Sequence, residues 1–417
     1  MSESDADVLI VGGGVIGLSC ARYLQRAGRS VRVIDRGLVG GATSHGNCGT
    51  LTPSHAPPLA APGVIAKGLR WMLQPDAPLY IRPRLDPALA AWLLRFAARA
   101  NRRDWWFTAR AKFELLRHSR QLIEALVREE ALDCEFRASG LRYAYRSEAA
   151  FAADRAGLVD LRELGIDWSL LDGPELAAAE PALLPGMAGG IHFPGDAQLR
   201  PERYTAELAR RIREQGGQIE ENTEVLGLLV HSGAAEGVMT SAGEIRARDV
   251  LVALGPWSAG MLKSCGLRLP VQPGKGYSIT YSRPRVTPTV PLVLRERSVC
   301  VTSWQDGFRL GSTMEFSGYD SSLNPVRLAA LERGAAEYLR EPVGPQVRER
   351  WMGWRPMTYD DLPILGAAPG LQRLWLATGH GMMGMGMSAG TGQLIADLIT
   401  GKQPAIDPQP TSPTRFA

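Results

Sequence analysis

Glycines at a spacing suited to a bound pyrophosphate follow a short apolar run near the N-terminus. Residues 8–11 (VLIV) have the continuous apolar character of a parallel strand buried on both faces, and GGGVIG at 12–17 follows directly. In this pattern Gly12 allows a tight turn, Gly14 lets phosphates approach the backbone, and Gly17 lets the next helix pack close to the strand. We therefore predict a dinucleotide site whose cofactor-binding residues include Gly12, Gly14, Val15, Ile16 and Gly17.

A second apolar run places a carboxylate beside these glycines. Residues 31–34 are typical of a buried strand that ends at Asp35, and Arg36 follows. A carboxylate there accepts hydrogen bonds from ribose hydroxyls and repels a 2′-phosphate, which argues against NADP. We predict that Asp35 and Arg36 bind the cofactor, while the fingerprint alone does not separate FAD from NAD.

The elements that position these residues come from separate parts of the chain. The alternation of strand and helix stops after Asp35, and a polar, glycine-rich loop follows at 40–53. Longer strand-like runs between 270 and 318 predict an antiparallel sheet, and the proline-rich tail at 403–417 predicts a loose terminus. Helices are predicted at 87–131, 147–165, 201–215, 324–338 and 384–400.

Length and composition fit a globular protein with two domains. The chain has 417 residues, 22% of them charged, and a net charge of +4, too mild to indicate nucleic acid as a partner. Its five scattered cysteines form no CxxC pair, so we expect neither a disulfide framework nor a bound metal. Neither a secretory signal nor an apolar run long enough for a spanning helix is visible, so we expect a cytoplasmic protein.

The expected fold class is α/β, with a Rossmann-like binding domain built from discontinuous segments. An α+β substrate lobe that contains the antiparallel sheet is inserted between these segments. The expected boundaries are 1–52, 196–270 and 345–417 for the binding domain, and 53–195 and 271–344 for the lobe.

Six segments in a fixed order resemble one family. They are the glycines at 12–17, TSHGNCGTLTP, APPLAAPGVIAKGLRWMLQPDAPLYI, ALGPWS, GWRPMTYDDLPILG and TGHGMMGM. Together they make the chain similar to the FAD-dependent D-amino-acid oxidase/dehydrogenase superfamily. The similarity is greatest to the small subunit of bacterial D-amino-acid dehydrogenase and to D-hydroxyproline dehydrogenase, and it extends over nearly the whole chain.

The resemblance implies non-covalent FAD and the oxidation of D-amino acids to imino acids, which water converts to 2-oxo acids. Hydride would pass from Cα to flavin N5, and the electrons would pass to a quinone-type acceptor. Within this class the alternatives are a D-hydroxyproline or D-proline dehydrogenase and a glycine/sarcosine-type oxidase that uses oxygen. Outside it, the alternatives are a flavoprotein subunit of a heteromeric dehydrogenase and a dinucleotide-sensing module that binds NAD.

The resemblance also implies which residues act on the substrate. Arg355, in GWRPMTYDD, would clamp the substrate carboxylate, because a planar guanidinium gives two parallel charge-assisted hydrogen bonds. Tyr277 is our choice among the aromatic residues of the lobe, and His55 would line the substrate pocket. The alternatives are a surface arginine that caps a loop for Arg355 and a structural role for His55.

Further segments would contact the flavin. The stretch 379–385 (GHGMMGM) precedes a predicted helix whose free N–H groups can stabilise negative charge on the reduced ring; the alternative is a methionine-rich core face. Small residues in the loop 43–51 let the backbone approach the ring, Val225 would bind adenine, and Gly255 marks a second close approach. The cofactor-binding set is completed by Thr43, Ser44, Gly49, Thr50, Leu51, Val225, Gly255, Gly381, Met382, Met383, Gly384 and Met385.

Residues 56–106 have two interpretations. Apolar helices with tryptophans and flanking arginines are typical of an interfacial helix on an anionic membrane, here the inner face of the cell membrane. The same pattern also fits a core helix with a solvated basic face. The residues concerned include Trp71, Trp92, Trp105, Trp106, Arg95, Arg99, Arg102 and Arg103.

Overall fold

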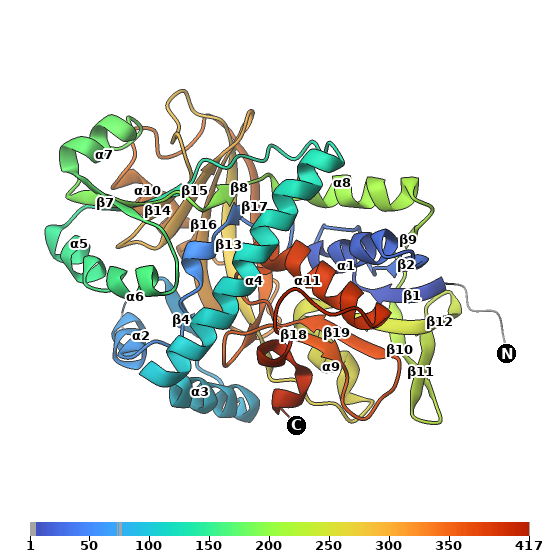
Figure 1. Cartoon of the computed structure of the whole chain (residues 1–417). Helices are drawn as coiled ribbons and strands as arrows, with labels where there is room; N and C mark the ends of the chain where they lie inside the picture. Colours follow the sequence, from blue (N-terminus) through green and yellow to red (C-terminus); the bar gives the residue numbers. More distant parts are fainter. Residues whose placement is uncertain (1–5, 73, 75–76, 417) are drawn as a thin grey trace.

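Two large β-sheets and a small pair of strands, β3 (Thr50–Leu51) and β8 (Ala197–Gln198), form the fold, with helices packed around the first large sheet (Figure 1). The computed structural model describes residues 6–72, 74 and 77–416. Within these ranges eight strands form the first sheet, in the order β10-β11-β12-β1-β2-β9, with β19 beside β12 and β18 beside β19. Their bounds are β1 Ala6–Val11, β2 Val31–Ile34, β9 Gln218–Glu220, β10 Val225–His231, β11 Ala234–Thr240, β12 Gly243–Val252, β18 Ile364–Ala367 and β19 Leu374–Thr378.

The centre of the first sheet is parallel. β1 pairs in parallel with β2 and β12, and β19 and β9 extend this arrangement on either side. Helices cover such a sheet, which explains why β1 and β2 are apolar runs without alternation. The predicted Rossmann-like arrangement of distant segments is confirmed.

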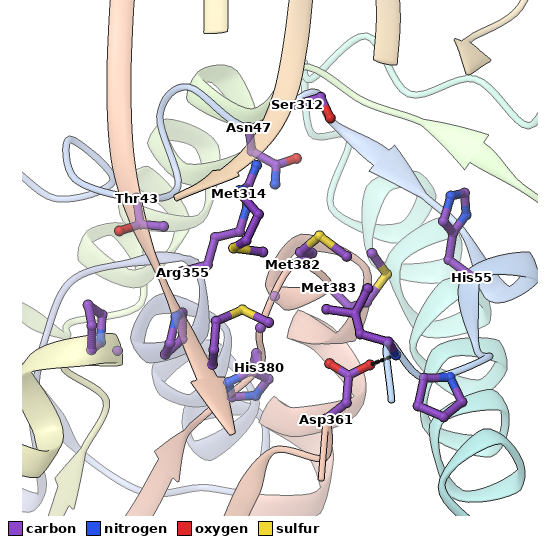
Figure 2. Close-up of a pocket in the computed structure, with 18 of the residues that line it drawn as sticks. Thr43, Asn47, His55, Ser312, Met314, Arg355, Asp361, His380, Met382 and Met383 are labelled. Carbon is purple, nitrogen blue, oxygen red and sulfur yellow. Dashed lines mark hydrogen bonds between the residues drawn. The ribbon is translucent and has the colours of Figure 1, made fainter. Parts of the chain in front are cut away.

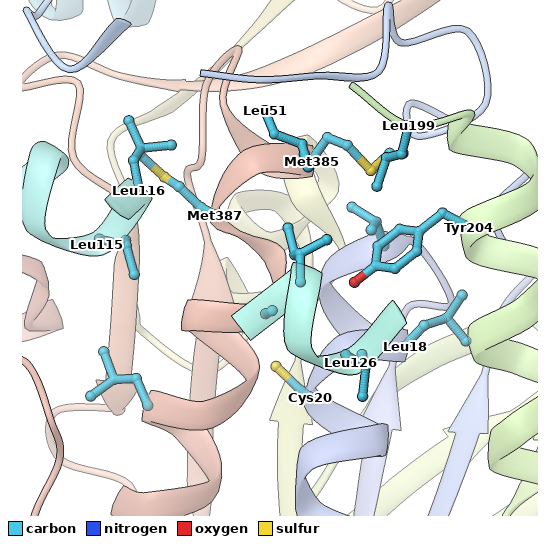
Figure 3. Close-up of a cluster of buried hydrophobic side chains, with 14 of the residues drawn as sticks. Leu18, Cys20, Leu51, Leu115, Leu116, Leu126, Leu199, Tyr204, Met385 and Met387 are labelled. Atoms are coloured by element: carbon cyan, nitrogen blue, oxygen red, sulfur yellow. The ribbon is translucent and has the colours of Figure 1, made fainter. Parts of the chain in front are cut away.

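Several helices cover the first sheet, and a glycine lets two of them pack closely together. α1 (Val15–Arg26) packs against α11 (Gly384–Thr400) and α8 (Pro201–Glu214), and α4 (Arg102–Glu129) crosses α11 from outside (Figure 1). A Cβ at Gly392 would lie 2.7 Å from the Ser19 carbonyl oxygen, so glycine permits this close helix contact. The buried side chains between these helices are shown in Figure 3 and include Leu18, Cys20, Leu115, Leu116, Leu126, Tyr204, Met385 and Met387.

Nine strands of the described chain form the second sheet. Their order is β17-β13-β16-β15-β14-β5-β7-β6, with β4 beside β16. The bounds are β4 Leu79–Ile81, β5 Leu141–Tyr145, β6 Ser169–Asp172, β7 Gly189–Phe193, β13 Val271–Ser282, β14 Leu292–Leu294, β15 Val299–Ser303, β16 Gly307–Phe316 and β17 Val347–Thr358. β13, β16 and β15 are antiparallel neighbours, as the sequence predicts for 270–318, and β17 pairs antiparallel with β13 on the other side.

The remaining elements are short. The helices are α2 Val64–Met72, α3 Pro87–Arg99, α5 Glu148–Arg155, α6 Leu158–Glu163, α7 Gly173–Ala179, α9 Ser258–Lys263 and α10 Pro325–Ala336. The 3-10 turns and the smallest strands are η1 Pro53–His55, η2 Gly255–Trp257, η3 Gln409–Thr411, η4 Pro413–Phe416, β3 Thr50–Leu51 and β8 Ala197–Gln198. No helix within the described ranges combines the length and the hydrophobicity needed to cross a bilayer.

Several features differ from expectation. The helices predicted at 87–131 and 147–165 are each divided into two, α3 with α4 and α5 with α6. β17 belongs to the second sheet, because it pairs with β13 from Val271 to Tyr281, although residues 345–417 are expected in the binding domain. The domain boundaries otherwise stay predictions. The prediction of a loose C-terminal tail is wrong, because the tail is anchored. Arg415 Nε lies 2.8 Å from Asp360 Oδ2, and the Phe416 ring packs edge-on against the Tyr359 ring at 5.4 Å.

Candidate active site

A large cavity lies between the two sheets. Its volume is about 1730 Å³, and it is lined by the turn after β1, the start of α11 and the inner face of the second sheet (Figure 2). All of the predicted cofactor- and substrate-binding residues line it except Gly17, Gly49 and Leu51. Segments far apart in the sequence therefore meet around one space.

The turn after β1 depends on glycine. Gly12 has φ of 114°, and a Cβ there would lie 2.5 Å from the carbonyl oxygen of Ala253. A Cβ at Gly17 would lie 1.9 Å from the carbonyl oxygen of Gly12, so α1 approaches β1 this closely only with glycine at position 17. Gly17 thus shapes the turn from behind without lining the cavity.

The N-terminus of α1 and the end of β2 form one end of the cavity. The Val15 N–H donates to Ser44 Oγ at 3.0 Å, which ties the loop 43–51 to the first turn of α1. Asp35 accepts the N–H groups of Gly13 at 2.8 Å and of Gly37 at 2.9 Å while it lines the cavity. The carboxylate therefore holds the glycine turn in place in addition to its predicted contact with ribose.

The adjoining wall carries three more predicted residues. Gly255 has φ of 55°, Val225 begins β10, and the Arg36 guanidinium stacks over Trp257 at 4.6 Å. These residues fit FAD, because the glycine turn leaves room for a pyrophosphate at a helix N-terminus. The cavity then continues from that turn to the second sheet, which leaves space for the ring system.

The start of α11 faces the same cavity. Gly381 has φ of 54°, and all residues from Gly381 to Met385 line the cavity. Met382 and Met383 are labelled in Figure 2. His380 is buried, and its Nε2 lies 3.0 Å from Thr391 Oγ1. Burial lowers the pKa of His380 to about 3, so its imidazole is neutral and holds the turn before α11.

The loop between β2 and β3 supplies small residues but few direct contacts. Thr43 Oγ1 donates to the carbonyl oxygen of Trp354 at 2.9 Å, and Thr50 lines the cavity. Gly49 has φ of 74°, and a Cβ there would lie 2.0 Å from the Leu199 carbonyl oxygen. Gly49 serves local packing, and Leu51 is fully buried in the core shown in Figure 3.

The loop 43–51 contains one histidine and one cysteine, side-chain types through which a flavin can be attached covalently. His45 Nε2 lies 2.9 Å from Glu349 Oε1, and Cys48 Sγ would lie 2.4 Å from a Cβ at Gly311. Both side chains are thus held by the second sheet, and non-covalent FAD stays the expectation. Within the described ranges no three His, Cys, Asp or Glu side chains are grouped to hold a metal ion.

Arg355 projects from β17 into the cavity. Its guanidinium occupies the space above Gly276, where a Cβ would lie 2.3 Å from Cζ, and its Nη1 donates to the Thr313 carbonyl oxygen at 2.6 Å. Thr313 has φ of 64°, at the irregular pairing of β13 and β16 that turns this carbonyl toward Arg355. Burial lowers the pKa of Arg355, and among the described residues its guanidinium has no carboxylate partner.

Tyr277 and His55 differ in how they meet the cavity. The Tyr277 hydroxyl donates to Glu315 Oε2 at 3.0 Å, so its proton is already bound by a buried carboxylate. His55 lies on the opposite side of the view from Arg355, with Met382 and Met383 between them (Figure 2). Their catalytic roles stay predictions.

Several residues at the site had no sequence signal. Lys112 Nζ lies 2.6 Å from Asp361 Oδ2, and this buried pair ties α4 to the turn after β17. Tyr143, on β5, and Ser54, in η1, line the cavity beside His55. An isolated lysine on a helix or a tyrosine in a strand looks ordinary until the tertiary structure pairs it.

Comparison with known proteins identifies the family of the chain. The family described as FAD dependent oxidoreductase matches residues 7–398. The chain belongs to this family. FAD is accordingly its cofactor, and the architecture is that of a flavoprotein oxidoreductase.

Curated relatives of this oxidoreductase are similar over almost their full length. A D-amino acid dehydrogenase of Chromohalobacter salexigens is 36% identical, covering 98% of this chain and 99% of that protein. One from Paramagnetospirillum magneticum is 37% identical, covering 96% of each. The crystal structure of glycine oxidase from Geobacillus kaustophilus superposes with a TM-score of 0.79 at 25% identity, covering 98% of both chains.

Proposed function

We propose that this chain is an FAD-dependent dehydrogenase that oxidises D-amino acids to imino acids. The observation that carries the proposal is the Arg355 guanidinium, which has no carboxylate partner in the described part of the chain and lies in the cavity that also contains the glycine turn. A partly buried cation without a counter-ion is costly, and a substrate carboxylate would relieve that cost with two charge-assisted hydrogen bonds. Bound FAD supplies a hydride acceptor for the bond between Cα and hydrogen.

The protein's contribution is orientation. Thr313 fixes one edge of the Arg355 guanidinium, which leaves the other nitrogens directed at the substrate. The N-terminus of α11 adds backbone N–H groups where negative charge develops. An amine that reaches the site unprotonated assists departure of the hydride, so the rate should rise with pH.

Anaerobic flavin bleaching tests this proposal. The holoenzyme is mixed with a panel of D- and L-amino acids, including both enantiomers of proline and of hydroxyproline, and the flavin absorbance is followed. Bleaching by D-amino acids alone supports the proposal, and bleaching by L-amino acids alone would contradict it. Fast reoxidation under air with peroxide formation would instead indicate an oxidase.

For the electron acceptor we propose a membrane quinone, reached from the surface of α2 and α3. Ile65, Leu69 and Met72 form an exposed apolar face on α2, and Leu94 on α3 is 73% exposed. Exposed arginines occur on α2, on α3 and at the start of α4, and exposed apolar and basic side chains together suit an anionic bilayer. Trp92 and Trp105 do not take part, because both are buried. The supporting arginines are Arg70, Arg95, Arg99, Arg102 and Arg103.

Vesicle flotation tests this contact. The holoenzyme should float with vesicles that contain phosphatidylglycerol even at high salt, since apolar insertion survives screening of charge. Leu69→Glu should abolish flotation, and Val326→Glu, a matched change at an exposed apolar residue of α10, should not. Equal flotation of both variants would remove α2 from the proposal.

A further inference from the structure

The floor of the cavity is one row of residues across the second sheet. Gly311 on β16 pairs with Cys300 on β15, Cys300 with Val293 on β14, and Val293 with Tyr143 on β5. Paired residues share a face of the sheet, and all four line the cavity. Strands lie about 4.8 Å apart, so Gly311 and Tyr143 are separated by roughly 14 Å.

Arg355 and Tyr143 lie at opposite ends of this floor. The Arg355 guanidinium sits above Gly276 on β13, one strand beyond Gly311. A substrate carboxylate on Arg355 therefore leaves the substrate side chain to run along the floor toward β5. Only a long side chain reaches Tyr143.

A chain of hydrogen bonds fixes the hydroxyl at the far end. Tyr143 Oη lies 3.0 Å from His55 Nε2, His55 Nδ1 lies 3.3 Å from Ser54 Oγ, and Ser54 Oγ lies 2.5 Å from Asp196 Oδ2. The Ser54 N–H also donates to Asp196 Oδ1 at 3.1 Å. Asp196 is fully buried behind the cavity wall.

These contacts allow one direction of donation when Asp196 is ionised. The Ser54 hydroxyl then donates to Asp196, His55 Nδ1–H donates to Ser54, and the Tyr143 hydroxyl donates to His55 Nε2. Burial, with Arg295 and Lys112 nearby, lowers the pKa of His55 to about 3, which keeps the imidazole neutral. Burial raises the pKa of Asp196 to about 7 against the opposing effect of Arg120, so this arrangement holds above that pH.

With its proton committed to His55, the Tyr143 oxygen offers only lone pairs to the cavity. The ring itself is held edge-on by Phe193 at 5.0 Å and by His55 at 5.6 Å. The charged groups nearby are already paired, Arg295 with Asp154 and Lys112 with Asp361. The surroundings of Tyr143 thus suit a neutral group that donates a hydrogen bond.

We propose that this end of the cavity is a side-chain subsite, in which Tyr143 accepts a hydrogen bond from a neutral donor at the tip of a long D-amino acid. The assignment rests on the proposed function and narrows its substrate class. Tyr143 is the contact residue, and His55 and Ser54 are positioning residues. A cationic tip is disfavoured, because Arg295 stacks over Tyr143 at 5.4 Å.

D-Homocitrulline and Nε-acetyl-D-lysine provide the sharpest test, since both side chains are long and they differ only in a terminal NH2 or methyl group. Above pH 7, kcat/KM for anaerobic flavin reduction should favour D-homocitrulline by about tenfold, the worth of a neutral hydrogen bond in a desolvated site. Tyr143→Phe should remove this preference and leave the value for Nε-acetyl-D-lysine within about threefold. Ser54→Ala should weaken the preference, and Tyr281→Phe, which removes a buried hydroxyl outside the cavity, should keep it.

Binding without turnover gives an independent readout. The α-methyl derivatives of the same two amino acids lack the Cα hydrogen, so their Kd values from flavin absorbance report contacts alone. The same preference, lost in Tyr143→Phe, is expected. Equal treatment of both amino acids, persistence of the preference in Tyr143→Phe, or reduction by small D-amino acids but by neither of these long ones would overturn the subsite. If no D-amino acid bleaches the flavin, the proposed function fails instead.

Discussion

The two ends of the cavity are built by different means. The dinucleotide end is made of backbone: Gly12, Gly17 and the first turn of α1 shape it within a stretch of adjacent residues. The substrate end is made of side chains from strands and turns far apart in the chain, among them Arg355 and Tyr143. The first depends on excluded volume and the second on charge and hydrogen bonding, so the two should respond to substitution in different ways.

Loss of the glycine at position 17 should give the largest effect. In Gly17→Ala the new Cβ would lie 1.9 Å from the Gly12 carbonyl oxygen, and backbone atoms cannot yield as a flexible side chain would. We expect protein without bound FAD or with little folded material, measured as the ratio of flavin to protein and by the melting temperature. Gly227→Ala, where a Cβ would meet nothing within 4 Å, should retain FAD. Full flavin content in Gly17→Ala would show that the turn tolerates movement.

Arg355 should separate binding of substrate from binding of cofactor. Arg355→Ala removes a charged bidentate partner, and we expect KM for amino acids to rise by about 10²- to 10³-fold. Arg355→Lys should recover only part of this loss, because an ammonium group lacks the planar fork. FAD content should match that of Arg350→Ala, an exposed arginine on the same strand. An unchanged KM would exclude Arg355 from the substrate site.

The same contrast explains how far the sequence could predict the molecule. Local signals sufficed for the glycine turn, for Asp35, and for the helix 384–400 with Gly401 in the left-handed conformation after it. Arg355 carried a motif, and the structure places it in the cavity. Tyr277 was one choice among several lobe aromatics, and its hydroxyl faces Glu315.

Other parts of the substrate end could not be predicted, for physical reasons. Tyr143 lies in one row with Cys300 and Gly311 because of the register of four strands. That register depends on the packing of the whole sheet. Ser54 and Asp196 are 142 positions apart, and nothing local marks either residue as half of a pair. The C-terminal tail was misjudged because its anchor, Asp360, lies in a distant turn.

The buried ion pair of Lys112 and Asp361 tests how much a side-chain contact at the substrate end contributes to the stability of the fold. Lys112→Met leaves Asp361 buried without its cation, which should cost about 3–5 kcal/mol of unfolding free energy. Urea unfolding of the holoenzyme measures this loss. Adding Asp361→Asn should recover part of it, since no buried charge then remains unpaired. Lys263→Met, at an exposed lysine, serves as the control, and an equal effect there would argue against the pair.

The smallest effect is expected where the loop 43–51 contacts the second sheet, at His45 of the loop and Glu349 of β17. Their hydrogen bond raises the pKa of His45 above 6.5 and lowers that of Glu349 below 4.5. A raised histidine pKa stabilises the fold below 6.5 and loses that contribution as pH rises through the raised value. A lowered glutamate pKa stabilises it above 4.5 and loses its contribution as pH falls through the lowered value.

The contact should therefore stabilise the fold most between about pH 4.5 and 6.5. Both side chains are about one-third exposed, so solvent limits the gain to less than about 1 kcal/mol. Melting curves of the wild type and of His45→Gln should differ near about pH 6 and converge near about pH 9. A difference in melting temperature that stays constant across this range would mean that His45 acts through packing rather than charge. The loop 43–51 and β17 would then be in contact without electrostatic coupling.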